Sequence, residues 1–212
     1  MRLDHVSFAV GPDGLAGTTN RLTELLDAKF VDGGVHPRFG TRNMILPLES
    51  DQYLEIVEVL DHPASDKAPF GQAVRERSEA GGGWLGWVVA VDDIGPVEHR
   101  IGRHAVPGNR RRPDGYNLEW QQIGVKGLQS DPQLPFVVSW DIPSSEHPSQ
   151  SGPATTRLAS LEIAGNPQRV TDWLGEPALD ALEGIEVDWV APNGMPGIVA
   201  ARFETPQGPV RV

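Results

Sequence analysis

The chain of 212 residues contains no cysteine. Disulfides, zinc-thiolate sites, iron–sulfur clusters and thiol nucleophiles are therefore excluded. No segment approaches the roughly 18 uninterrupted apolar residues of a membrane-spanning helix, so we expect no membrane partner. The first residues, MRLDHVSFAV, enter a strand-like pattern at once, without the basic and apolar segments of a signal peptide. A cytoplasmic protein is the expectation that follows.

Positive charge is also scarce. The chain has 18 Lys and Arg against 29 Asp and Glu, a net charge of -11, and this balance argues against a nucleic-acid partner. Its content of 39% hydrophobic and 22% charged residues is typical of a globular protein. The length is sufficient for a substantial core, and the sequence leaves a homodimer open.

Glycine (24) and proline (19) divide the chain into short elements. In the first of these, residues 3–10, apolar and polar side chains alternate, which places His5 and Ser7 on one face and Asp4 and Val6 on the other. A helix is expected over residues 15–26. Further strands are expected over residues 29–31, 41–47 and 52–59, so the order is β-α-β-β-β.

The rest of the chain repeats this order of elements twice. The repeats share the order of predicted strands and helices but have weak sequence identity. The predicted fold class is therefore α+β, with repeated β-α-β-β-β modules. We divide the chain into a first module (1–60), a linker with a short helix (61–83), a second module (84–142), a linker rich in Ser and Pro (143–156) and a third, degenerate module (157–212).

His5 and Glu55 are the most informative residues. Each lies in a short apolar strand-like run, LDHVSFAV and YLEIVEV, on the first and last strands of the first module. An imidazole and a carboxylate that face one concavity form half of a divalent metal site, which ordinarily has three or more protein ligands. The alternative is a hydrogen-bonded pair on the sheet, in which the carboxylate orients the imidazole.

The segments LDHVSFAV, GGVHPRFGTRN, YLEIVEVL, GWLGWVVAVDD, RRRPDG and LPFVVSWD resemble the glyoxalase-like group of the vicinal oxygen chelate superfamily, over residues 1–148. The resemblance implies that paired modules curl mixed sheets around a ligand cavity. It also implies that His5 and Glu55 correspond to the metal ligands of the first module, for Zn, Fe, Mn or Ni. The second module is then expected to supply two more ligands.

The second module does not contain these two ligands at the matching positions. Alignment of LDHVSFAV with LGWVVAV places Trp87 opposite His5, and the final strand offers Val138, Ser139 or Trp140 opposite Glu55. An indole at Trp87 is expected to form an aromatic wall of the cavity, suited to an apolar or aromatic ligand. Core packing is the alternative for any one tryptophan of this module.

Two more histidines and one basic cluster complete the candidates. His36 and His147 follow strands and are expected to reach the cavity, with exposed turn residues as the alternative. In RRRPDG, a Pro-Asp-Gly turn indicates a hairpin. Arg112 is the candidate for bidentate binding of a carboxylate or phosphate, whereas Arg110 and Arg111 are expected to be solvated.

Two functions remain open at this point. One is a metal-dependent lyase, isomerase or dioxygenase, in which the metal acts as a Lewis acid. The other is a glyoxalase-like, metal-free protein whose cavity binds a small acidic or aromatic molecule, and the missing ligands narrowly favour it. The predicted ligand-binding residues are His5, His36, Glu55, Trp87, Arg112, Trp140 and His147, and the predicted metal ligands are His5 and Glu55.

Overall fold

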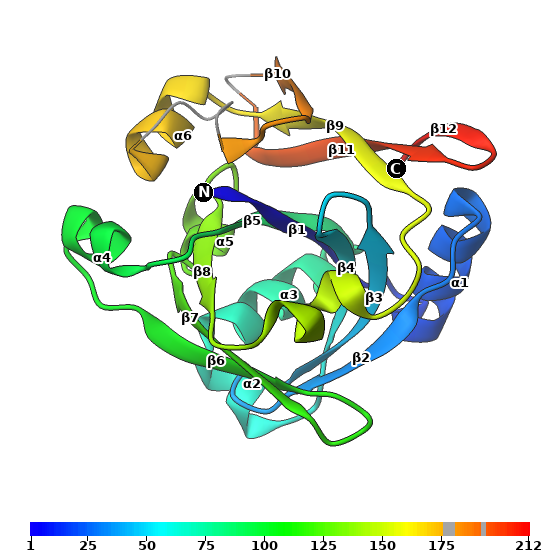
Figure 1. The fold of residues 1–212 in the computed structure, drawn as a ribbon, viewed down its shortest axis with the longest axis horizontal. Helices are drawn as coiled ribbons and strands as arrows, with labels where there is room; N and C mark the ends of the chain where they lie inside the picture. The colour runs from blue at the N-terminus through cyan, green and yellow to red at the C-terminus, as the bar shows by residue number, and fades with distance from the viewer. Residues whose placement is uncertain (176–180, 192–193) are drawn as a thin grey trace.

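The computed structural model describes residues 1–175, 181–191 and 194–212. Eight strands form a closed barrel in the order β1-β4-β3-β2-β6-β7-β8-β5 (Figure 1). The strands of the barrel are β1 (Arg2–Ala9), β2 (Val31–His36), β3 (Thr41–Leu48), β4 (Gln52–Val59), β5 (Gly83–Ala90), β6 (Val106–Arg111), β7 (Asn117–Ile123) and β8 (Phe136–Trp140).

The barrel is built from two similar halves. In each half the first strand pairs in parallel with the last, β1 with β4 and β5 with β8, while the other pairs are antiparallel. The halves meet at two antiparallel contacts, β1 with β5 and β2 with β6. The predicted α+β fold, with a curved mixed sheet around a cavity, is confirmed.

Short helices connect the strands. Several begin with proline in the first turn, where its missing N–H is tolerated. No helix in the described parts of the chain is both long enough and apolar enough to cross a membrane. The helices are α1 (Gly14–Leu26), α2 (Pro63–Lys67), α3 (Pro69–Glu79), α4 (Gly95–Ile101), α5 (Gly127–Ser130) and α6 (Pro167–Leu174), with two 3-10 turns, η1 (Ser144–Glu146) and η2 (Pro148–Gln150).

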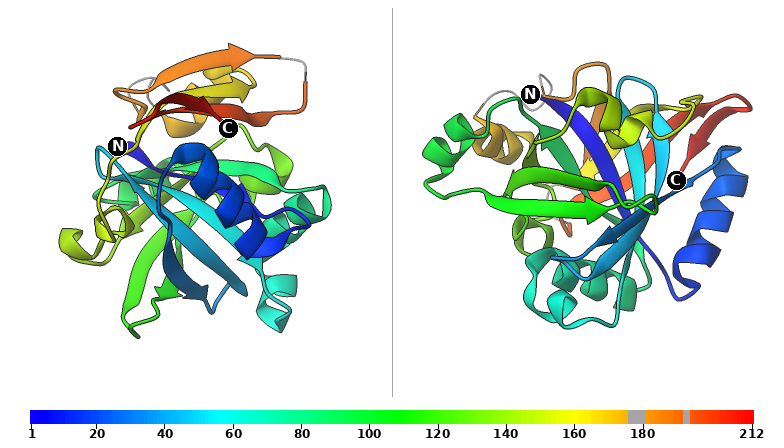
Figure 2. Two further views of the ribbon diagram at one scale, coloured as in Figure 1. Left: turned by 90° about the vertical axis from the view of Figure 1, so that its right-hand side faces the viewer. Right: turned by 60° about the horizontal axis from the view of Figure 1, so that its bottom comes forward.

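A second sheet lies outside the barrel, next to β1 and β5 (Figures 1 and 2). Its strand order is β10-β9-β11-β12, and β9 pairs in parallel with β10. The described elements from β9 onward run in the order β-α-β-β-β, and the division into three modules stays a prediction. The bounds are β9 (Arg157–Ala164), β10 (Glu186–Val190), β11 (Gly197–Thr205) and β12 (Gly208–Arg211).

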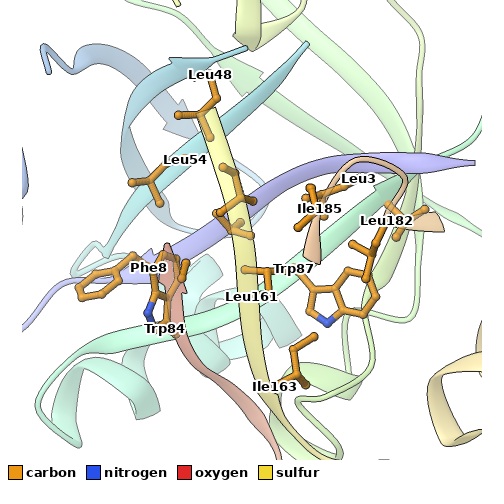
Figure 3. Close-up of a cluster of buried hydrophobic side chains, with 14 of the residues drawn as sticks. Leu3, Phe8, Leu48, Leu54, Trp84, Trp87, Leu161, Ile163, Leu182 and Ile185 are labelled. Atoms are coloured by element: carbon orange, nitrogen blue, oxygen red, sulfur yellow. The ribbon is translucent and has the colours of Figure 1, made fainter. Parts of the chain in front are cut away.

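Two clusters of buried side chains follow from this arrangement. One lies between the barrel and the second sheet, where Trp87 and Leu161 approach each other (Figure 3). The other includes Phe39, Phe70 and Trp120 and belongs to the interior of the barrel. Because alternate residues of β1 and β5 face the two clusters, the barrel wall separates the core between the sheets from the interior of the barrel.

Candidate functional site

The interior of the barrel contains a small cavity, in which the centres of water-sized molecules have about 30 Å³ of space. Its wall combines aromatic rings with charged and polar groups from both halves of the barrel. A Cβ at Gly108 on β6 would overlap the indole of Trp120, so glycine allows this ring to lie across the strand. The lining residues are His5, His36, Phe39, Tyr53, Glu55, Phe70, Arg110, Trp120, Gln122, Phe136, Val138 and Trp140.

His5 is held by its chain neighbour Asp4, which the strand alternation placed on the other face. The register between β1 and β5 shifts between Leu3 and His5, so Asp4 is the extra residue of a bulge. The bulge turns the Asp4 carboxylate toward the imidazole, and Nδ1 of His5 lies 2.8 Å from Oδ2 of Asp4. The prediction that Asp4 and His5 point to opposite faces of β1 is therefore wrong.

The Asp4 carboxylate is fully buried and accepts two further hydrogen bonds. Nε2 of His147 and Nε1 of Trp140 each donate to Oδ1 at 3.1 Å. Burial raises the pKa of Asp4, but the hydrogen bonds from His147 and His5 outweigh it and hold the pKa well below its ordinary value. Asp4 is therefore ionised and can only accept, so Nδ1 of His5 carries the proton.

Glu55 lies beside His5 on the parallel strand β4, where Ser7 is its register partner. The hydroxyl of Ser7 donates to Oε2 at 2.7 Å, and the amide of Asn43 donates to Oε1 at 2.7 Å. Burial raises the pKa of Glu55, but His36, His5 and these two donors bring it below its ordinary value. Glu55 is consequently an ionised carboxylate with both oxygens engaged.

His36 is the last residue of β2, which begins at Val31 and shares only this residue with the strand expected over residues 29–31. Nδ1 of its ring is 2.9 Å from Oγ1 of Thr41, and Nε2 is 3.8 Å from Oε1 of Glu55. Burial lowers the pKa of His36 to about 4, and the opposing field of Glu55 does not restore it. The imidazole is neutral near pH 7, in agreement with its surroundings of aromatic rings.

This shift makes a measurable contribution to stability. An imidazole whose pKa falls from 6.5 unfolded to about 4 folded binds more protons in the unfolded chain between these values, so stability is lost as the pH falls through this window. The free energy of unfolding is expected to drop by about 2 kcal/mol between about pH 7.5 and pH 5, and His36→Gln should remove this component. Urea unfolding at both pH values measures it. His104→Gln, at a fully exposed position, should behave as wild type.

Arg110 lies inside the cavity wall, contrary to the expectation that it is solvated. It is 4% exposed, and its Nε has no hydrogen-bond partner. No ion pair of Arg110 occurs among the described residues, although the fields of Tyr53 and Glu55 reach it. Burial lowers the pKa of Arg110, yet a guanidinium remains charged in proteins. The cavity therefore contains a buried cation that has no ion pair among the described residues and no hydrogen-bond partner for Nε.

Arg112 has the opposite environment. It lies beyond the end of β6, where its guanidinium contacts Asp114 and Glu146, each at 2.7 Å, and covers the ring of Tyr116. The burial pattern of β6 alternates, with Gly108 and Arg110 facing inward. The predicted hairpin is present, but the arginine that reaches the cavity is two positions earlier than expected.

Trp87 does not line the cavity. The residue opposite His5 in the register of β1 and β5 is Val88, so Trp87 faces the second sheet. Its side chain is fully buried among residues of the core between the sheets (Figure 3). Its Nε1 donates to the carbonyl oxygen of Gln133 at 2.9 Å. Trp87 pairs with Val6 across β1 and β5, so the expectation that it forms an aromatic wall of the cavity is wrong.

The structure brings together His5, His36, Glu55 and Trp140, all of which line the cavity. His147 lies between η1 and η2, behind the cavity, and reaches it through Asp4 and the edge of Trp140. It also lines an outer pocket that shares Trp140 with the cavity. Residues that the sequence did not single out are Asp4, Phe39, Tyr53, Phe70, Arg110, Gln122 and Phe136.

The donor set does not fit the divalent metal that the fold family implies. In the parallel pair β1 and β4, His5 is opposite Tyr53, and in β5 and β8 the matching pair is Val88 and Phe136. The side chains Val88, Phe136 and Val138, which β5 and β8 contribute to the interior of the barrel, are hydrocarbon and cannot bind a metal. The described residues contain no group of three or more His, Cys, Asp or Glu able to hold a metal.

Comparison with known proteins supports this architecture. A family model described as a glyoxalase-like domain matches residues 3–178. A hypothetical protein from Staphylococcus aureus is similar in structure, with a TM-score of 0.58 and 18% sequence identity over 82% of this chain and 74% of that chain. No curated protein matches.

Two methylmalonyl-CoA epimerase structures have lower scores. The enzyme from Mycobacterium tuberculosis has a TM-score of 0.43 and 16% identity over 66% of this chain and 86% of that chain. The enzyme from Streptomyces coelicolor, in complex with 2-nitronate-propionyl-CoA, has a TM-score of 0.45 and 18% identity over 67% of this chain and 99% of that chain. At these identities the likeness concerns the fold alone.

Proposed function

Because this chain belongs to the glyoxalase-like domain family of the vicinal oxygen chelate superfamily, we propose that its barrel cavity binds a small organic anion without a metal ion. The observation that carries this proposal is the guanidinium of Arg110, which is buried in the cavity wall without a hydrogen-bond partner for Nε. A buried charge without a partner is costly. A bound anion compensates that cost.

The surrounding groups favour a carboxylate with a flat apolar body. The planar guanidinium matches a carboxylate in a bidentate arrangement. Aromatic rings such as Phe39, Phe70 and Trp120 offer broad apolar surfaces to the rest of the ligand. Glu55 is ionised and repels a second negative group, so one acidic group at the Arg110 end is the preferred pattern. This agrees with the acidic or aromatic ligand expected from the sequence, with Arg110 in place of Arg112.

The binding prediction compares two arginines. 3-Phenylpropionate is expected to quench tryptophan fluorescence of the wild-type protein, because Trp120 and Trp140 line the cavity. Arg110→Gln should weaken binding by roughly 100-fold or more, as expected for loss of one partner of a buried charge pair. Arg112→Gln is the matched control and should remain within about threefold of wild type, since its exposed ion pairs contribute little.

Metal independence is tested in the same assay. The affinity should be unchanged after extensive treatment with a chelator, and Zn²⁺, Mn²⁺, Fe²⁺ or Ni²⁺ should not raise the melting temperature. A bound metal would raise it by mass action. A metal-dependent rise that Glu55→Gln abolishes, or equal losses of affinity in Arg110→Gln and Arg112→Gln, would contradict the proposal.

A further inference from the structure

We propose that the cavity is also a site of proton transfer, in which His5 accepts a proton from a small 2-oxo carboxylic acid and Asp4 positions the imidazole. This inference rests on the proposed function, because Arg110 holds the carboxylate of the same ligand. It concerns a chemical step that anion binding alone does not require.

The first step concerns the free nitrogen of His5. Nδ1 donates to Asp4, while Nε2 has no hydrogen-bond partner among the described residues, and the ring lines the cavity. The ring is stacked on Tyr53, with centroids 4.3 Å apart and planes at 18°, which fixes its orientation. Buried polar atoms are ordinarily satisfied within the protein. A histidine with one nitrogen on a carboxylate and a lone pair facing a cavity is arranged to accept a proton.

The second step concerns Asp4. His5 on β1, Trp140 on β8 and His147 between η1 and η2 hold its carboxylate, and a side-chain hydrogen bond also joins it to Tyr53 on β4. A negative charge fixed at Nδ1 selects the tautomer with its lone pair on Nε2 and stabilises the imidazolium that forms when Nε2 takes a proton. Asp4 does not line the cavity, so it acts through His5 as a positioning residue.

The third step excludes the other bases in the cavity. Burial lowers the pKa of His36 to about 4, which makes its imidazole a weak base. Glu55 is also a weak base, because its pKa lies below its ordinary value while Ser7 and Asn43 donate to its two oxygens. Among the described residues of the wall, His5 combines a ring nitrogen without a hydrogen bond with a carboxylate behind the ring.

The fourth step identifies the substrate class. An imidazole removes a proton far more readily from a carbon next to a ketone than from a simple carboxylic acid. In a 2-oxo acid the C3–H bond breaks, its electron pair forms the C2=C3 double bond, and the negative charge moves to the C2 oxygen. The proton passes to Nε2 of His5 and returns to the oxygen to give the enol, or to carbon to restore the ketone. No oxidant or reductant is required.

One amide is placed to assist at the oxygen. Nε1 of Trp120 donates to Oε1 of Gln122 at 2.7 Å, and an indole can only donate, so the orientation of the Gln122 amide is fixed. Its NH₂ group is left without a hydrogen bond to any described residue and belongs to the cavity wall. Together with Arg110 it supplies hydrogen-bond donors for the charge that develops on the C2 oxygen.

The experiment uses phenylpyruvate as the probe, because it combines a carboxylate, an aromatic ring and C3 protons next to a ketone. Proton NMR in D₂O follows the loss of the C3 signal. Wild-type protein should accelerate exchange above buffer, and His5→Gln should lower the rate by roughly 100-fold or more, the usual contribution of a general base. His104→Gln, at an exposed position, should exchange as wild type.

A second measurement separates positioning from structural support. In Asp4→Asn the pH of half-maximal exchange should move to lower values, because the imidazolium loses the stabilising carboxylate. Since Asp4 is fully buried and its variant can fail to fold, ¹⁵N NMR of the wild-type protein gives an independent result. Neutral His5 should carry its proton on Nδ1, and a proton on Nε2 would overturn the inference.

The outcomes distinguish this inference from the proposed function. If both acids bind and Arg110→Gln weakens them, but phenylpyruvate exchanges only at the buffer rate, proton transfer is refuted and anion binding stands. Full exchange in His5→Gln refutes the role of His5. If neither acid binds, the proposed function fails and this inference fails with it.

Discussion

Replacement of Trp87 by alanine is expected to lower the free energy of unfolding by about 3–5 kcal/mol, while the cavity keeps its affinity for anions. Trp87 is fully buried and is among the largest such side chains of the protein. Its removal leaves a hole between the barrel and the second sheet and deprives the carbonyl oxygen of Gln133 of its donor. Urea unfolding measures the loss, and fluorescence titration well below the melting temperature measures the affinity.

Trp120→Ala is the matched comparison, because that indole lines the cavity. It should weaken the binding of 3-phenylpropionate, by roughly the 1 kcal/mol or more that an aromatic contact contributes. If Trp87→Ala fails to fold, Trp87→Phe retains most of the volume and serves the same purpose. A larger loss of affinity in the Trp87 variant than in Trp120→Ala would restore the interpretation of Trp87 as a cavity wall.

The fold was predictable because hydrophobic alternation and turn residues are local signals. The strand candidates at residues 41–47 and 52–59 correspond closely to Thr41–Leu48 and Gln52–Val59. The same local signals placed His5 and Glu55 on one concave face. What they do not contain is the register between distant strands. An alignment by apolar pattern placed Trp87 in the cavity wall, although it pairs with Val6 and faces the second sheet.

The bulge at Asp4 illustrates a second limit. Regular alternation predicts that Asp4 and His5 point to opposite faces, and only the pairing of β1 with β5 shows the extra residue that brings them together. The partners that stabilise this carboxylate, Trp140 and His147, are 136 and 143 positions away in the chain. Sequence spacing gives no indication of contacts over such distances.

The arginines of the hairpin show the same limit at close range. The Pro-Asp-Gly turn was recognisable, and β6 and β7 flank it. The side of the hairpin on which each arginine lies depends on where the regular pairing of β6 with β7 ends. Arg110 is still within β6 and faces inward, whereas Arg112 lies in the turn and is free to reach Glu146. Arg110 and Arg112 therefore have opposite environments although they are two residues apart.

Because the two environments differ, replacements of Arg110 and Arg112 are expected to change the free energy of unfolding in opposite directions. In the absence of ligand, Arg110→Met is expected to raise the free energy of unfolding by about 1–4 kcal/mol, the scale found when buried ion pairs are replaced by apolar side chains of similar volume. The variant removes a cation whose burial is not compensated, and Glu55 keeps its hydrogen bonds from Ser7 and Asn43. Urea unfolding of the ligand-free proteins measures the change.

Arg112→Met should change stability in the other direction, by less than about 1 kcal/mol, because its pairs with Asp114 and Glu146 are partly exposed. Addition of 3-phenylpropionate should then stabilise the wild type and Arg112→Met but not Arg110→Met, since only a state that binds ligand gains by mass action. A gain of stability at the expense of binding is expected for a residue kept for function. If Arg110→Met instead unfolds more easily without ligand, Arg110 supports the barrel, and the argument for an anion in this cavity loses its basis.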